Sequence, residues 1–109
     1  MKLTVRFYQT PGGSSPVAQY LESLEELEAV CIYAVLAEIQ RIGLKGPLVQ
    51  IRSIRGKLWE LKLGKYRVFY VLITGSVMLL LHACKKQSQK ARQRDLGVAL
   101  SRMKHVVPE

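Results

Sequence analysis

Three strand-like segments follow one another in the second half of this chain, and two short turns join them. The segments at residues 58–63, 66–74 and 77–86 are rich in β-branched and aromatic side chains. The two residues at 64–65 have the length that β-hairpins favour, and the Thr-Gly-Ser sequence at 74–76 makes the second turn. Strands joined in this way form an antiparallel meander, so we expect the chain to fold around a small sheet.

The residues on the N-terminal side of the meander predict one strand and two helices. Residues 2–8 alternate between polar and apolar positions, which is typical of a short strand. Apolar residues recur at helical spacing over 17–42, with a break near 25–28. We therefore expect two consecutive helices that form an antiparallel pair.

A last helix is predicted after Gln89, because the apolar spacing becomes helical again there. Its apolar face holds Leu96, Ala99, Leu100 and Met103.

A chain of 109 residues has the size of one domain, so residues 1–109 form a single unit. The predicted class is α+β, with the order β-α-α-β-β-β-α and a small, mostly antiparallel sheet. We expect the helices to pack on one face and to leave a basic, concave face open.

Charge is distributed unevenly along the sequence. Thirteen of the 17 basic residues lie between Arg52 and Lys104, where only Glu60 and Asp95 are acidic. This half therefore carries a net charge of +11, more than the +9 of the whole chain. Lysines and arginines that project from a rigid sheet can neutralise backbone phosphates and release counterions. The pattern indicates nucleic acid, or a partner that mimics it, as the ligand.

Several other classes of protein are disfavoured. Cys31 and Cys84 follow no metal or redox spacing, which is typical of reduced thiols in a cytoplasmic protein. No apolar segment follows the N-terminus as in a signal peptide, and the apolar run at 68–84 is broken by the turn at 74–76. We therefore expect no membrane segment. The basic sheet offers neither a carboxylate pair nor a His/Cys cluster, so we expect no metal and no cofactor.

Two stretches of sequence carry a resemblance to a known family. The stretches are LWELKLGKYRVFY at 58–70 and LLLHACKKQSQKARQRDL at 79–96. Together they resemble the phage-derived, HigB-like toxins of the RelE/ParE superfamily, and the order of predicted elements is similar over the whole chain. Glu60 departs from the pattern, because RelE-type nucleases have lysine there. Gln87 falls about where those nucleases place an arginine, and the adjacent Lys86 can substitute for it.

The resemblance implies a type II toxin–antitoxin system. Its toxin is a small endoribonuclease that cuts mRNA, on the ribosome in RelE-like members, and a HigA-like helix-turn-helix antitoxin holds it inactive. The antitoxin would contact the basic sheet through an acidic segment, or bind the Glu-rich helices around residues 22–38. Two other functions stay open at this point. One is inhibition of DNA gyrase by a ParE-like toxin on the same fold, and the other is RNA binding without catalysis.

Cleavage of this kind needs no nucleophile from the protein, because the ribose 2′-hydroxyl attacks its own phosphate. Preorganised positive charge does most of the work. Arg67 is the first catalytic candidate, with a salt bridge to Glu60 as the alternative. Lys62 shares its strand face, and the hairpin brings the two together. Lys85 and Lys86 end the last strand on opposite faces, as catalytic groups or as solvated lysines.

A histidine side chain can act as an acid or base near neutral pH, so His82 is either an acid or base in catalysis or a hydrogen-bonded core residue. Tyr66 and Tyr70 share a strand face, where their rings either stack on RNA bases or pack in the core. The remaining basic residues of the sheet and of the last helix are predicted to bind RNA or to be solvated. They are Lys57, Lys65, Lys90, Arg92 and Arg94.

Overall fold

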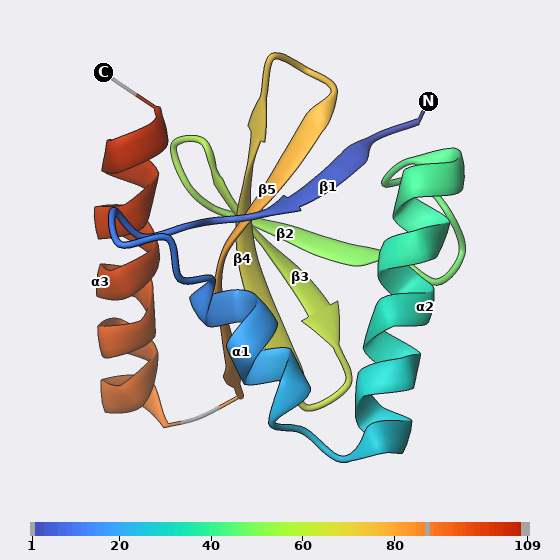
Figure 1. Ribbon diagram of the computed structural model, residues 1–109, viewed down its shortest axis with the longest axis horizontal. Coiled ribbons are helices and arrows are strands. Elements are labelled where there is room, and N and C mark those ends of the chain that lie inside the picture. Colours follow the sequence, from blue (N-terminus) through green and yellow to red (C-terminus); the bar gives the residue numbers. More distant parts are fainter. Residues whose placement is uncertain (1, 87, 108–109) are drawn as a thin grey trace.

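The computed structural model describes residues 2–86 and 88–107, except for the side chain of Ala91. Eight elements follow in the order β-α-α-β-β-β-β-α (Figure 1). They are β1 (Thr4–Phe7), α1 (Pro16–Glu22), α2 (Glu26–Ile42), β2 (Gln50–Arg55), β3 (Leu58–Leu63), β4 (Tyr66–Ile73), β5 (Val77–Lys85) and α3 (Gln89–Val106). The α+β class and the predicted order are confirmed, with β2 as an additional strand.

The five strands form one sheet in the order β1-β5-β4-β3-β2. The predicted meander forms its larger part, since β3, β4 and β5 pair antiparallel with their sequence neighbours. A two-residue turn joins β3 to β4, and Gly64 adopts a φ of 63° there, a conformation that side chains with a Cβ rarely take. The N-terminal strand β1 joins the sheet beside β5 and runs parallel to it.

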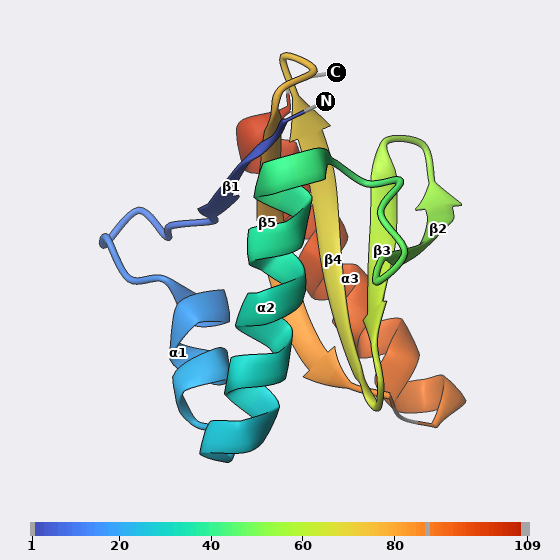
Figure 2. The same ribbon diagram turned by 90° about the vertical axis from the view of Figure 1, so that its right-hand side faces the viewer.

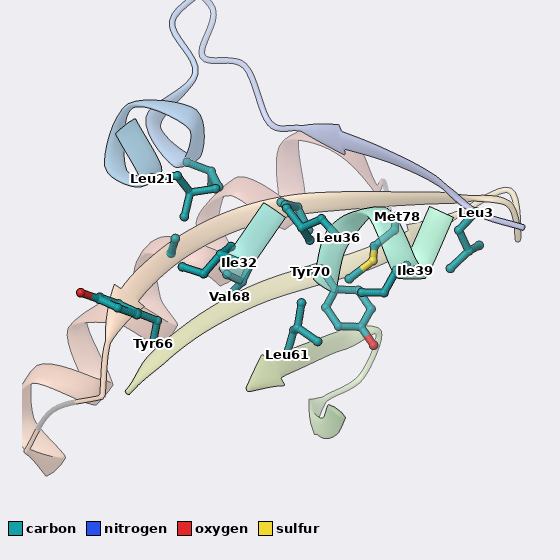
Figure 3. Close-up of a cluster of buried hydrophobic side chains, with 13 residues drawn as sticks. Leu3, Leu21, Ile32, Leu36, Ile39, Leu61, Tyr66, Val68, Tyr70 and Met78 are labelled. Atoms are coloured by element: carbon teal, nitrogen blue, oxygen red, sulfur yellow. The ribbon is translucent and has the colours of Figure 1, made fainter. Parts of the chain in front are cut away.

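Helices α1 and α2 cover one face of the sheet. They run in opposite directions, and the chain breaks between them at Ser23, Leu24 and Glu25, close to the predicted position (Figure 2). Alternate residues of the strands point towards them and form the first core cluster (Figure 3). Its buried members include Leu21, Ile32, Leu36, Ile39, Leu61, Val68, Tyr70 and Met78.

The prediction that all helices pack on one face is wrong, because α3 packs on the opposite face (Figure 2). Its apolar stripe meets a second buried cluster, in which Ala99 packs with Leu58, Phe69 and Val71. The physical reason is visible in β4, whose residues 68–71 are all buried and apolar. Such a run is typical of a strand that is covered on both sides. The open basic surface is therefore smaller than predicted and lies towards the β3–β4 turn.

Strand β2 was not predicted from the sequence. Its apolar residues Ile51 and Ile54 are three positions apart, so they do not follow the period of two that marks a strand. Residues three apart on a strand point to opposite faces, so Ile51 packs at the first cluster and Ile54 at the second. The pairing of β2 with β3 is in addition irregular between Ser53 and Arg55. None of the helices in the described part of the chain is long and apolar enough to cross a membrane.

Candidate nucleic-acid interface

Lys62 and Arg67 lie opposite each other on β3 and β4, one residue pair from the turn. Both are partly exposed and lie on the face of the sheet that α3 covers further along. The Arg67 guanidinium donates hydrogen bonds from Nη1 to the carbonyl oxygens of Gly64 at 2.6 Å and Tyr66 at 2.8 Å. It forms no salt bridge with Glu60, which was the alternative for this arginine. Both bonds use one nitrogen, so Nη2 and Nε remain as donors for a ligand.

Three more lysines lie at the same end of the sheet. Lys65 occupies the turn itself, and its Nζ lies 3.0 Å from the carboxylate of Glu28 on α2. The backbone N–H of Lys86 donates to the carbonyl oxygen of Lys65 at 2.7 Å, which brings the end of β5 beside the turn. Lys85 pairs with Tyr66 in the ladder, and both strand-end lysines are exposed. The hairpin end therefore gathers five cations: Lys62, Lys65, Arg67, Lys85 and Lys86.

Lys57 does not belong to this group. It lies in the turn between β2 and β3, just before the first residue of β3, whereas Lys62 is near the last residue of that strand. Five residues of extended chain separate the two, which corresponds to roughly 16 Å. Lys57 and the hairpin cations therefore cannot contact the same phosphate.

A cavity of about 690 Å³ opens between α2 and the hairpin end. Leu27 and Val35 of α2 and Leu48 before β2 give it apolar walls. Lys62, Lys65 and Arg67 also line it. The cavity combines apolar surface with positive charge, which suits a nucleobase beside its phosphate or the side chains of an acidic protein segment.

Glu60 is fully buried, with 0% of its surface exposed, and it lies between two arginines. Arg92 of α3 donates from Nη1 to Oε2 at 2.9 Å. Arg52 of β2 holds its Nη2 3.1 Å from Oε1, a distance of an ion pair without the angle of a good hydrogen bond. The carboxylate thus links the edge strand, the middle of the sheet and the start of α3.

His82 links β5 to α3. Its Nε2 lies 2.8 Å from Oδ1 of Asp95, and its ring stacks on Phe69. Nδ1 faces Nη1 of Arg102 at 3.4 Å, and the same nitrogen donates to the carbonyl oxygen of Leu81 at 2.8 Å. Both ring nitrogens therefore have partners on α3. This arrangement favours the structural alternative for His82 over a role as an acid or base.

Cys84 joins His82 and Asp95 in a group whose possible ligand atoms lie within 4.8 Å of one another. Burial, with a smaller effect from Asp95, raises the pKa of the Cys84 thiol to about 12. A metal needs the thiolate, and the charge of Arg102 beside His82 opposes a further cation. The residue types would suit zinc, but their surroundings do not. The absence of a metal stays a prediction.

Tyr66 and Tyr70 point into the first core cluster, which favours the packing alternative for their rings over stacking on RNA bases. Tyr70 is 1% exposed, and burial raises its pKa to about 12. The Tyr66 hydroxyl donates to Oε1 of Glu28 at 3.0 Å, and burial followed by this bond raises the pKa of Tyr66. The pattern of the sequence places both rings on one strand face, but it cannot decide which helices cover that face.

The predicted RNA contacts of α3 divide into two groups. Lys90 and Arg94 are exposed, whereas Arg92 is partly buried against Glu60 and lies over the ring of Phe69. Arg52 was not among the predicted RNA-binding residues, because strand β2, on which it lies, was not predicted. Gln87 lies outside the described residues, so its comparison with the family arginine has no structural counterpart.

Comparison with known proteins gives one match of fold and one match of family. The fold matches RelE from the crystal structure of the archaeal RelE–RelB complex from Pyrococcus horikoshii OT3, with a TM-score of 0.60 and 18% sequence identity. The match covers 79% of this chain and 97% of that one. At this identity the likeness establishes the fold alone, which is similar to that of RelE.

The sequence also matches a family profile. The family described as "Phage derived protein Gp49-like (DUF891)" matches residues 19–104, and the chain belongs to that family. No curated protein sequence matches the chain. The predicted resemblance to a phage-derived family is thus confirmed, and the fold is similar to that of RelE.

Proposed function

We propose that this protein is the toxin of a type II toxin–antitoxin system. In this proposal it is a HigB-like endoribonuclease that cuts mRNA on the ribosome and so inhibits translation in the cytoplasm. The observation that carries the proposal is the pairing of Lys62 and Arg67 across the ladder at one end of the sheet, beside which β5 ends in Lys85 and Lys86. A cluster of cations on rigid strands suits a phosphate whose negative charge grows during the reaction.

The chemistry follows from what the cluster offers. The 2′-hydroxyl loses its proton to water and attacks the adjacent phosphorus, and the bond to the 5′-oxygen of the next nucleotide breaks. The released 5′-oxygen takes up a proton from water, and a 2′,3′-cyclic phosphate remains. Arg67 is already oriented by its two bonds to backbone carbonyl oxygens, so little reorganisation is needed when it binds a phosphate. Lys62 stands beside it and neutralises the same group. No metal enters this mechanism.

A neutralising partner also has support. Leu27, Val30 and Leu48 are large apolar side chains that are more than half exposed, and the first and last line the cavity beside the hairpin. Apolar surface next to a strongly basic one suits a protein segment with apolar and acidic residues. The matched RelE was crystallised as a complex with RelB. We propose a HigA-like helix-turn-helix antitoxin as the partner of this chain.

One observation favours a non-catalytic alternative. His82 has both ring nitrogens engaged, so among the described residues the hairpin cluster offers cations but no free acid–base group with a pKa near neutrality. A ParE-like inhibitor of DNA gyrase, or a protein that only binds RNA, would need no such group. The cation cluster supports the nuclease, because charge stabilisation and positioning suffice for this reaction.

Purified protein decides between these functions. It is incubated with an mRNA alone in the presence of EDTA, and with an mRNA on translating ribosomes in a Mg²⁺ buffer, because ribosomes dissociate without Mg²⁺. The proposal expects discrete cuts with 2′,3′-cyclic phosphate ends, at least on the ribosome. Intact RNA together with inhibited supercoiling by gyrase would support the alternative instead. Bound but intact RNA would leave only an RNA-binding protein.

A further inference from the structure

We propose that Arg52 and Arg92, held on either side of the buried carboxylate of Glu60, form a second phosphate-binding site next to Lys62 and Arg67. The inference rests on the proposed action on RNA and adds a site for the neighbouring phosphate of the same strand. Arg52 and Glu60 have no part in the cluster at the hairpin end. The ligand class is a single-stranded polynucleotide.

The first support is the charge of the group. Two guanidinium groups face one carboxylate, so one positive charge is left in excess. Glu60 is fully buried, whereas the side chains of Arg52 and Arg92 are 50% and 28% exposed. The negative charge is therefore hidden from a ligand and the positive charges are presented to it.

The second support is the set of donors that remain. A guanidinium has five N–H donors in a fixed plane, and one Nη of each arginine approaches Glu60. Among the described residues, neither side chain makes another hydrogen bond or ion pair; Arg92 in addition lies over the Phe69 ring. The remaining donors can grip phosphate oxygens in pairs, which a lysine cannot do. Glu60 orients the guanidinium groups of Arg52 and Arg92 before RNA binds, so these side chains lose less rotamer freedom when it does.

The third support is position. Glu60 and Lys62 are two residues apart on β3 and point to the same face, a separation of roughly 7 Å. This separation is of the same order as the step between successive phosphates of an extended single strand. The cation pair of Lys62 and Arg67 and the arginine pair at Glu60 would then hold neighbouring phosphates, with Glu60 as a positioning residue.

The competing interpretation is that Glu60 only fastens α3 to the sheet. The two interpretations predict opposite signs for Glu60→Gln, which raises the net charge of the chain by one. If Glu60 does no more than fasten α3, the added positive charge tightens the binding of RNA. If Glu60 orients the arginines, binding weakens in spite of the added charge, because the two guanidinium groups lose their common anchor and repel each other.

The test uses full-length protein and a 2′-O-methyl RNA of about ten nucleotides, which lacks the nucleophile and cannot be cut. Affinity is measured by fluorescence anisotropy over a range of salt concentrations. Arg52→Gln should weaken binding about tenfold and lower the salt slope by about 0.7, the value for one phosphate contact on a single strand. Glu60→Gln should weaken binding severalfold, and Arg52→Lys should restore the salt slope but only part of the affinity.

Lys104→Gln is the matched control, because Lys104 is exposed on α3 about 18 Å along the helix from Arg92. Thermal unfolding of each variant verifies that it is folded at the assay temperature. Unchanged or tighter binding by Arg52→Gln and Glu60→Gln, with Arg67→Gln still weakened, would overturn this inference and leave the proposed function standing. If the unsubstituted protein binds the oligonucleotide without salt dependence, the proposed action on RNA itself fails.

Discussion

Lys62 and Arg67 are direct partners across the β3–β4 ladder, and they are the residue pair next to the one that closes the hairpin. Their positions are fixed by the two-residue turn at Gly64 and Lys65, whose length sets the register of the two strands. A change of one residue in that register would move one of the two side chains to the opposite face. The local hairpin therefore determines the geometry of the proposed catalytic centre.

Because both cations face one phosphate in this account, their contributions to cleavage should not be additive. We expect Lys62→Gln and Arg67→Gln each to lower the single-turnover cleavage rate about 10²- to 10³-fold. The double variant should lose less than the product of the two factors, since the second substitution acts on a site that is already defective. Fully multiplicative losses would show that the two residues act at separate places. Lys45→Gln, a change of the same charge in the exposed loop after α2, serves as the control.

Arg92→Ala should lower the free energy of unfolding by about 3 kcal/mol, because it leaves the buried carboxylate of Glu60 with one partner instead of two. Arg94→Ala removes the same charge from an exposed position two residues away and should change stability by at most about 0.5 kcal/mol. Urea denaturation of the two variants measures the difference. Equal stabilities would contradict the role of the Glu60–Arg92 contact in holding α3.

The contact between Glu28 and the hairpin predicts a dependence on pH. Hydrogen bonds from Lys65 and then Tyr66 hold the pKa of Glu28 below its ordinary value of 4.5. A lowered pKa means that the folded state favours the carboxylate, so this stabilisation is present above pH 4.5 and is lost as the pH falls through the folded pKa. The stability difference between the unsubstituted protein and Glu28→Gln should therefore close in acid. A difference that does not change between pH 7 and pH 3 would contradict the contact.

The two cysteines should differ in reactivity. Cys31 is exposed on α2, whereas Cys84 is buried under α3 and has a pKa of about 12. At pH 8 a thiol reagent such as Ellman's reagent should modify one thiol per folded chain, and the second should react only after unfolding. The raised pKa means that folding favours the neutral thiol, so the contribution of Cys84 to stability is lost as pH rises from 9 towards 12. Rapid modification of Cys84 in the folded Cys31→Ser variant, or of both thiols in the folded native chain, would contradict this burial.

Helices and strands that are specified by neighbouring residues could be predicted from the sequence. The strands of the meander were predicted within one residue of their observed ends, since their turns and β-branched runs are specified by neighbouring residues. The cross-strand position of Lys62 and Arg67 followed from the same turn. The stripe of Leu96, Ala99, Leu100 and Met103 likewise predicted the last helix.

Properties that depend on distant contacts were not predictable in the same way. Ile51 and Ile54 lie on opposite faces of β2 and pack at different clusters, so no alternation of apolar and polar residues signalled a strand. Nothing local decides that α3 covers the second face, and this choice determines the partners of His82 and Glu60. The burial of Tyr66 and Tyr70 depends in turn on α1 and α2 covering the first face.

The most direct test of the central claim compares cells that express the unsubstituted chain, Arg67→Ala and Arg41→Ala, with RNA 5′ ends mapped at single-nucleotide resolution. Arg41 is an exposed arginine of α2 paired with Glu38, so its loss removes the same charge far from the hairpin. The account predicts growth arrest and discrete cuts within translated mRNA for the unsubstituted chain and Arg41→Ala, and neither for Arg67→Ala at equal protein levels. Growth arrest with intact mRNA, or cuts that persist in Arg67→Ala, would contradict it.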